Sequence, residues 1–324
     1  MKVIEVQNLV KKFKSLAAVD GISFNVEQGE LFGLLGPNGA GKTTTMRVLT
    51  TLLQATSGTA SVAGFDVMRQ RNQVRTCIGM VFQEPALDRQ LTGRENLDFH
   101  GRMYAMKREL RKERIREVMD LVELSDRADD LVQTYSGGMQ RRLEIARGLM
   151  HSPKVLFLDE PTLGLDTQTR RRIWEYIRQM NESMGTTIIL STHYMEEADS
   201  LCGRVGIIDR GRIVAMDTPK RLKDLIGADV ITLETDCGDC DAFRKLDYVR
   251  DAVRHGSRLS LMVESGERKI PMLLSFADSQ GVKVTSVELH KPSLEDVFLR
   301  FTGSTLRDRE ADGPEIHGGM KRRR

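Results

Sequence analysis

One glycine-rich stretch has the residue types and spacing of a phosphate-binding loop. It reads Gly36-Pro37-Asn38-Gly39-Ala40-Gly41-Lys42-Thr43-Thr44, between an apolar segment at 30–35 and a helical pattern that begins near residue 42. Glycines allow backbone N–H groups to curl around phosphate oxygens, and the start of a helix adds partial positive charge. Lys42 would then hold the β- and γ-phosphates of a nucleotide, and Thr43 would ligate Mg²⁺. A glycine-rich turn that binds nothing is the alternative, which the position between a strand and a helix disfavours.

Two adjacent acidic residues form the second chemical feature. The apolar run at 155–158 is followed by Asp159 and Glu160, at the strand end where ligands collect in parallel α/β sheets. Two carboxylates at a buried strand end are costly unless a cation or a reacting water employs them. Asp159 suits Mg²⁺, and Glu160 suits a general base that polarises the attacking water. A surface acidic turn is the alternative, which the phosphate-binding pattern in the same chain disfavours.

A third motif carries a resemblance to a known family. The run Tyr135-Ser136-Gly137-Gly138-Met139-Gln140-Arg141 resembles the signature sequence of the ATP-binding cassette family, and the resemblance covers residues 1 to about 225. A serine and two glycines that open a helix create a second anion-binding end in the chain. The resemblance implies that this end closes on the γ-phosphate held by a second copy, so that two ATP molecules lie within a head-to-tail dimer. Tyr135 and Met139 replace the commoner Leu and Gln, so any hydrogen bond from that Gln side chain is absent.

Further positions match the family in order. The resemblance makes Gln83 a contact of Mg²⁺ and the attacking water, His193 a contact of the γ-phosphate, and Phe13 the ring that stacks on adenine. The loop 161–166, which ends at Asp166, would communicate between the two nucleotide sites. Taken alone, such a glutamine is usually a solvated turn residue, and a histidine after a strand is usually a structural hydrogen-bond donor. Phe13 taken alone could equally be a packed core residue.

The elements that must position these residues alternate between strands and helices. Strand patterns occur at 2–9, 22–26, 30–35, 78–82, 155–158, 187–190 and 205–209, and helical patterns at 168–182 and 195–202. This alternation favours a mostly parallel sheet covered by helices. Between about residues 87 and 150, charged sequence with helically spaced apolar residues predicts an inserted helical subdomain. The expected fold class is α/β, a P-loop ATPase of the cassette type, to which the resemblance adds an antiparallel β-subdomain.

The sequence after about residue 226 has a different pattern. Strands at 229–234, 249–255, 259–264 and 282–289, with helices at 241–246 and 267–280, follow the order βαββαβ of a small ferredoxin-like domain. A last helix is expected at 294–301. We therefore predict an ATPase domain at 1–226, a C-terminal α+β domain for regulation or dimerisation at 227–302, and a disordered basic tail at 303–324. Attraction of this tail to a membrane surface is a less favoured expectation.

Composition limits the partners. The net charge of +3 is spread over 49 basic and 46 acidic residues, which is too little to indicate a nucleic-acid binder, and no nucleic acid is expected. Cys237 and Cys240 lack the second pair or the histidines that a zinc site needs, so we expect reduced thiols. No apolar run approaches the roughly 20 residues of a membrane helix, and the N-terminus lacks a signal peptide's apolar stretch. The chain is therefore expected in the cytosol.

Three segments indicate the kind of cassette protein. The runs 91–97, 191–199 and 292–299 resemble the exporter branch typified by the daunorubicin-resistance ATP-binding subunit. This resemblance implies an ATPase at the cytoplasmic face of the cell membrane, which powers efflux of a hydrophobic, drug-like substrate through a separate integral-membrane permease. The alternative is a soluble cassette ATPase that acts as a conformational switch on a macromolecular partner. The sequence has no sustained heptads or paired cysteine motifs of the repair and chromosome types, which favours export.

Overall fold

A computed structural model describes residues 1–227, 229–235 and 241–303 of the chain. The expectations for Cys237, Cys240 and the basic tail beyond Gly303 lie outside these residues. The chain divides into two compact units, the first consisting of most of Met1–Met216 and the second mainly of the chain from Asp217 onward. The first unit contains two sheets and the second contains one, and each unit has its own apolar core.

A six-stranded sheet forms the centre of the first unit, in the order β10-β9-β3-β8-β7-β6. β3 pairs in parallel with β8 and β9, and β7 pairs in parallel with β6 and β8, so the carboxyl ends of these five strands share one edge. The central strands are buried on both faces, which explains their nearly continuous apolar sequence. The strands are β3 (Leu31–Leu35), β6 (Ile78–Val81), β7 (Val155–Asp159), β8 (Thr187–Thr192), β9 (Arg204–Asp209) and β10 (Arg212–Asp217).

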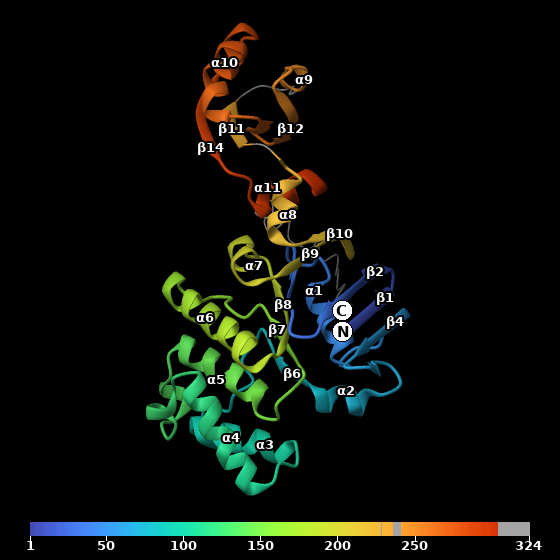
Figure 1. Ribbon diagram of the computed structural model, residues 1–324, viewed down its shortest axis with the longest axis vertical. Helices are drawn as coiled ribbons and strands as arrows, with labels where there is room; N and C mark the ends of the chain where they lie inside the picture. Colours follow the sequence, from blue (N-terminus) through green and yellow to red (C-terminus); the bar gives the residue numbers. More distant parts are fainter. Residues whose placement is uncertain (228, 236–240, 304–324) are drawn as a thin grey trace, which may run out of the picture. The chain divides into compact units, whose positions relative to one another are not determined.

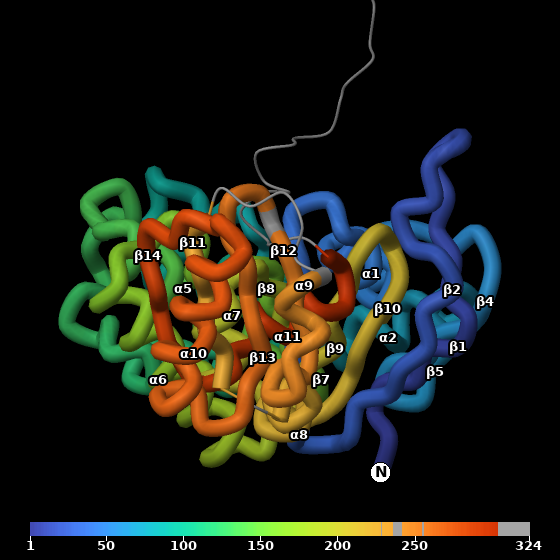
Figure 2. Tube along the Cα trace, turned by 90° about the horizontal axis from the view of Figure 1, so that it is seen from above, coloured from blue at the N-terminus to red at the C-terminus, as the bar shows by residue number. Residues whose placement is uncertain are grey.

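An antiparallel sheet in the order β2-β1-β4-β5 packs beside the central one, and Figure 2 shows its strands side by side. Its strands are β1 (Lys2–Phe13), β2 (Leu16–Glu27), β4 (Ser57–Val62) and β5 (Phe65–Asp66). β1 and β2 are longer than their sequence patterns predict, because register shifts let the pairing continue through irregular positions. Phe24 stacks on Phe32 with ring centroids 5.3 Å apart, which joins the two sheets in one core.

Helices cover the central sheet and form the inserted region. They are α1 (Lys42–Leu49), α2 (Arg71–Cys77), α3 (Gly93–Met103), α4 (Arg108–Leu121), α5 (Gly137–Leu149), α6 (Thr167–Met184) and α7 (Met195–Leu201), with short 3₁₀ helices at Ser125–Arg127 and Val132–Thr134. Figure 1 shows α3, α4 and α5 grouped together as the predicted helical insertion. A capping box starts α3, in which Thr92 and Glu95 satisfy each other's backbone N–H groups.

After α8, the second unit has the element order βαββαβ followed by a helix. Its sheet order, β12-β13-β11-β14, places the first and third strands in the centre, as in a ferredoxin-like fold. α9 and α10 bury Phe243 and Leu273 against Leu261 on β13. The elements are α8 (Pro219–Asp224), β11 (Asp229–Thr235), α9 (Asp241–Arg244), β12 (Val249–His255), β13 (Arg258–Val263), α10 (Gly266–Ser279), β14 (Val284–His290) and α11 (Leu294–Thr302).

Candidate active site

The loop between β3 and α1 has a backbone that only glycine allows at two positions. Gly41 has a φ of 107°, which L side chains rarely adopt. A Cβ atom at Gly36 would lie 2.1 Å from the carbonyl oxygen of Ile208, and one at Gly41 would lie 2.4 Å from that of Ala18. Residues 37–41 lead into α1, which begins at Lys42 and contains Thr43 and Thr44 in its first turn. The predicted phosphate-binding stretch is therefore a strand–turn–helix connection.

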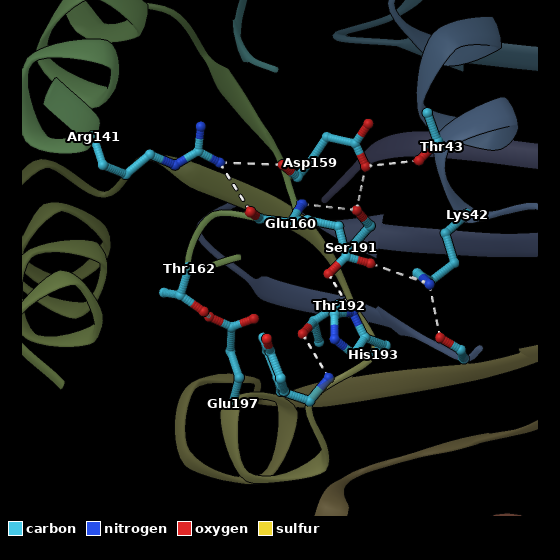
Figure 3. A network of polar contacts seen from close by, with 12 residues as sticks. Lys42, Thr43, Arg141, Asp159, Glu160, Thr162, Ser191, Thr192, His193 and Glu197 are labelled. Atoms are coloured by element: carbon cyan, nitrogen blue, oxygen red, sulfur yellow. Dashed lines mark hydrogen bonds and ion pairs between the residues drawn. The ribbon is translucent and has the colours of Figure 1, made fainter. Parts of the chain in front are cut away.

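Lys42 is buried at the edge where the parallel strands end. Its Nζ donates a hydrogen bond to the carbonyl oxygen of Gly36 at 2.7 Å and lies 3.2 Å from Oε1 of Glu160. Both side chains of this ion pair are 5% exposed. Figure 3 shows the lysine reaching from α1 toward the end of β7. A residue from the glycine-rich loop and one from the acidic pair, more than a hundred positions later, thus meet directly.

Asp159 and Thr43 bring two oxygen donors together. Thr43 Oγ1 donates to Asp159 Oδ1 at 3.0 Å, and Ser191 Oγ at the end of β8 donates to the same oxygen at 2.5 Å. Gln83 follows β6 and lines a cavity of about 320 Å³ together with Asp159. Within the described residues, no three His, Cys, Asp or Glu side chains form a cluster that could hold a metal. The oxygen donors here suit a cation that also takes ligands from phosphate and water.

Glu160 is held by its backbone and by His193. Its φ of 48° is strained for a residue with a side chain, and its N–H donates to the carbonyl oxygen of Ser191 at 3.1 Å. His193 follows β8, and its Nδ1 lies 2.7 Å from Glu160 Oε2. An ionised carboxylate can only accept, which assigns the proton to Nδ1. The strained backbone thus places the carboxylate of Glu160 between Lys42 of α1 and His193, which follows β8.

The electrostatic environment keeps Glu160 ionised. Burial is the largest influence and by itself raises the pKa, but the hydrogen bond from His193 and the charge of Lys42 together outweigh it. The net result is that the pKa of Glu160 lies below its usual value of 4.5. A carboxylate that is charged near neutral pH can accept a proton from water or polarise it.

Three residues at this site were not predicted from the sequence. Besides Ser191, they are Arg141, which contacts the backbone of Asp159 and Glu160 (Figure 3), and Glu197 on α7. Glu197 is fully buried, and its Oε1 accepts hydrogen bonds from Thr162 at 2.7 Å and Trp174 at 2.9 Å. Burial raises the pKa of Glu197 above its usual value. All three lie in runs quoted above for the family resemblance, Arg141 in 135–141 and the other two in 191–199, but those runs give them no role, because their partners are distant in sequence.

The other predicted residues have mainly local contacts. Ser136 caps α5 by accepting from the N–H of Met139 at 3.3 Å, with Gly137 and Gly138 in the first turn. Asp166 caps α6 by accepting from two N–H groups at 3.0 Å. Phe13 is 44% exposed at the end of β1, so it is not a packed core residue. Ser136 and Asp166 thus serve as helix caps, whereas Lys42, Glu160 and His193 contact one another at the strand ends.

Comparison with known proteins identifies this arrangement. Residues 19–163 match the family model described as ABC transporter, and residues 218–302 match that of the ATP-binding protein DrrA1-3-like C-terminal domain. The chain is 40% identical to the linearmycin resistance ATP-binding protein LnrL of Bacillus subtilis, over 94% of this chain and 100% of that protein. It is also 40% identical to the daunorubicin resistance ATP-binding protein DrrA2 of Streptomyces coeruleorubidus, over 95% of this chain and 97% of that protein.

A solved structure supports the same relationship. The dimeric post-hydrolysis state of an ATP-binding cassette bound to ADP and Pi has a TM-score of 0.61 and 27% identity, over 66% of this chain and 98% of that one. The predicted fold class and family are both confirmed. The chain belongs to the ABC transporter family, in which it is an ATP-binding protein that hydrolyses ATP and has a DrrA-like C-terminal domain.

Proposed function

We propose that this chain powers the export of a hydrophobic, drug-like substrate through a separate integral-membrane permease. One observation carries the ATPase half: Lys42, Glu160 and His193 meet within hydrogen-bonding or ion-pair distance at the carboxyl edge of a parallel sheet. The relatives carry the export half, because two of them are named for resistance to linearmycin and daunorubicin. These relatives do not favour the alternative of a soluble conformational switch on a macromolecular partner.

In this proposal, each buried residue has one role during ATP hydrolysis. The loop from Gly36 to Thr44 surrounds the phosphates, with backbone N–H groups after Pro37 as donors, and Lys42 neutralises charge on the β- and γ-phosphates. Glu160 polarises the attacking water, while His193 holds the carboxylate and contacts the γ-phosphate. Phe13 stacks on adenine, and its 44% exposure leaves the ring accessible for that contact. The barrier falls because these groups are already placed where charge develops.

Mg²⁺ fits the oxygen donors at Asp159. The hydroxyl of Thr43 and the carboxylate of Asp159 already lie 3.0 Å apart, and Gln83 lines the same cavity as Asp159. Mg²⁺ is usually held by one or two carboxylates with phosphate and water completing its shell, so three acidic residues are not needed. When bound, the ion would supply positive charge that neutralises the phosphates. Thr43, Asp159 and Gln83 are the residues that would hold or orient it.

A second copy of the chain completes the proposed site. The N-terminus of α5, opened by Ser136, Gly137 and Gly138, would bind the γ-phosphate held by the other copy. The loop that ends at Asp166 would carry information between the two sites. The cassette structure compared above is dimeric, which supports this arrangement. We assign residues 1–226 to the ATPase, 227–302 to dimer support or regulation, and 303–324 to a basic tail.

The permease is proposed to bind near α3. Phe99 and Met103 on this helix are 60% and 69% exposed, and both line a cavity with Asn96 and His100. No helix in the described ranges combines the length and apolarity needed to cross a bilayer. The exposed apolar side chains of α3 suit contact with a partner at the cytoplasmic face of the membrane. No nucleic acid is part of this proposal.

Purification from membranes tests the export half. We expect the tagged chain to be recovered from detergent-solubilised membranes with a small integral-membrane protein. Phe99→Glu should reduce that recovery at least about tenfold while the purified chain keeps its ATPase activity, because charge at a buried apolar contact is costly. Phe301→Glu is the matched control, since Phe301 is also exposed, at 44%, but belongs to the second unit. A wild-type chain found only in the soluble fraction would refute the proposal.

A further inference from the structure

Arg141 joins the signature helix to the ends of two strands of the central sheet. It lies on α5, one turn after Ser136, and is 7% exposed. Its Nε donates to the carbonyl oxygen of Pro161 at 2.6 Å, and its Nη1 donates to that of Phe82 at 2.6 Å. Its Nη2 donates to the carbonyl oxygens of Asp159 and Glu160, both at 3.1 Å. One guanidinium therefore binds four backbone carbonyls.

The four carbonyls belong to the segments that carry the proposed catalytic groups. Phe82 immediately precedes Gln83 at the end of β6, and the other three cover the acidic pair and the residue after it. Glu160 has a left-handed backbone, so the carbonyls around it leave the strand ladder and need other donors. Arg141 supplies such donors from a helix whose first turn is the predicted γ-phosphate contact for a second copy, and the N–H of Leu163 also donates to the carbonyl oxygen of Glu160 at 3.2 Å.

The cost of burying this cation indicates that its geometry matters. Burial is the largest influence and lowers the pKa of Arg141, whereas the nearby carboxylates, led by Glu144 and Glu197, act in the opposite direction. A planar guanidinium with five donors can bind carbonyls in three directions at once, which a lysine ammonium at the end of a flexible chain cannot reproduce. Replacing the arginine with lysine therefore keeps the positive charge but removes the planar set of donors that binds the four carbonyls.

We propose that Arg141 is a positioning residue for ATP hydrolysis, which holds the N-terminus of α5 in a fixed place relative to Glu160 and Gln83 of the same chain. This inference rests on the roles proposed above for Glu160 and for Ser136–Gly138. Within the described residues, the hydrogen bonds of the Arg141 side chain go to backbone carbonyls at and just after the strand ends. It acts on the chemical step because a displacement of about 1 Å in such a group can reduce the rate about 10²-fold.

A second arginine, on a neighbouring helix, provides a matched control because it binds carbonyls at the C-terminal end of α5. Arg114 on α4 donates to the carbonyl oxygens of Leu149 at 2.9 Å and Met150 at 3.4 Å. Its side chain is 13% exposed, so it too is a largely buried guanidinium that binds backbone carbonyls. Neither acceptor lies at the carboxyl edge of the sheet. Arg114→Lys therefore measures the cost of losing this type of contact without disturbing Glu160 or Gln83.

The test compares Arg141→Lys, Arg141→Gln and Arg114→Lys in the full chain with Mg²⁺ and ATP. The steady-state rate is divided by the concentration of ATP-binding sites, titrated with a fluorescent ATP analogue, so that unfolded protein does not count. We expect both Arg141 variants to lower kcat per site about 10²-fold with the ATP dissociation constant changed less than about twofold. Arg114→Lys should change kcat per site less than about twofold, even if its melting temperature falls equally.

Two results would overturn the inference. One is an Arg141 variant whose kcat per site stays within about twofold of the wild type. The other is an equal loss of kcat in Arg114→Lys, which would make the effect a general consequence of weakened packing. Glu160→Gln, measured alongside, distinguishes a failure of the role proposed for Glu160 from a failure of the role proposed for Arg141. If it still turns over, the proposed role of Glu160 fails, whereas an inactive Glu160→Gln beside an active Arg141→Lys rejects the role of Arg141 alone.

Discussion

The two units of this chain treat buried charge differently. In the first unit, most of the buried charged side chains converge on one edge of the sheet, among them Lys42, Arg141, Asp159, Glu160 and Glu197. Among the described residues of the second unit, Asp296 is the one charged side chain that is buried, and it caps a helix. Burying a charge is costly without a partner, so the concentration of buried charges in the first unit indicates a functional site. In the described part of the second unit, the buried side chains serve mainly to pack the core.

A histidine–carboxylate pair occurs in each unit and shows the same contrast. In the first, His193 contacts Glu160 at 2.7 Å beside Lys42, at a strand end. In the second, His290 contacts both carboxylate oxygens of Asp296 at 3.1 Å, and Ser293 completes a capping box with that aspartate. The second pair fastens the start of α11. A histidine–carboxylate pair is therefore proposed to serve hydrolysis in the first unit, whereas in the second it supports a helix cap.

The largest expected effect distinguishes the lysines of the two units. Lys42→Ala removes the buried cation between Gly36 and Glu160, and we expect ATP turnover to fall at least about 10³-fold. Lys291→Ala removes an exposed lysine, which pairs with Asp229 at 2.7 Å, and should leave turnover within about twofold. Phosphate release measured for both variants checks the contrast. Equal losses would show that the second unit also contributes to the chemistry.

An intermediate effect is expected from the histidine at the site. His193→Ala removes the hydrogen bond that helps to overcome burial, so the pKa of Glu160 should rise. We expect kcat to fall about 10²-fold, and its acid limb to move to higher pH because protonated Glu160 cannot polarise water. The measurement is kcat as a function of pH for both proteins. An acid limb that does not move would exclude His193 as the group that keeps Glu160 ionised.

The smallest expected effect is a pH dependence of stability in the second unit. The hydrogen bond to Asp296 raises the pKa of His290 above 6.5 in the folded protein. The pair therefore stabilises the fold fully below pH 6.5 and loses that contribution as the pH rises through the folded pKa. Partial exposure limits the effect to below about 1 kcal/mol. Urea unfolding from pH 5.5 to 8.5 should show this slope in the wild type and not in His290→Gln; identical slopes would contradict it.

Much of the site follows from sequence, because its motifs are contiguous. The loop from Gly36 to Thr44 and the acidic pair follow strands whose apolar patterns are clear, and their directions follow from parallel pairing. Arg141 and Glu197 could not be predicted in this way. Arg141 binds carbonyls that become available only when two strands end side by side, and Glu197 depends on Thr162 and Trp174, which are distant in sequence.

The fold shows the same limit. Helices and strands with strong periodicity were predicted near their observed places, whereas β4, β5, α2, β10 and α8 were not. β4 has a sequence of small and polar residues and becomes a strand because β1 pairs with it in the antiparallel sheet. β5 consists of only two residues and pairs with β4. Pairing partners rather than local preference determine such strands.

The most direct measurement is the turnover and assembly of Glu160→Gln with Mg²⁺ and ATP. The substitution keeps the size of the side chain and removes the carboxylate that Lys42 and His193 contact. If Glu160 polarises the attacking water between two copies of the chain, this variant should still bind ATP, hydrolyse it about 10³-fold more slowly and accumulate as a dimer. Turnover at the wild-type rate, with no ATP-dependent dimer, would contradict that role.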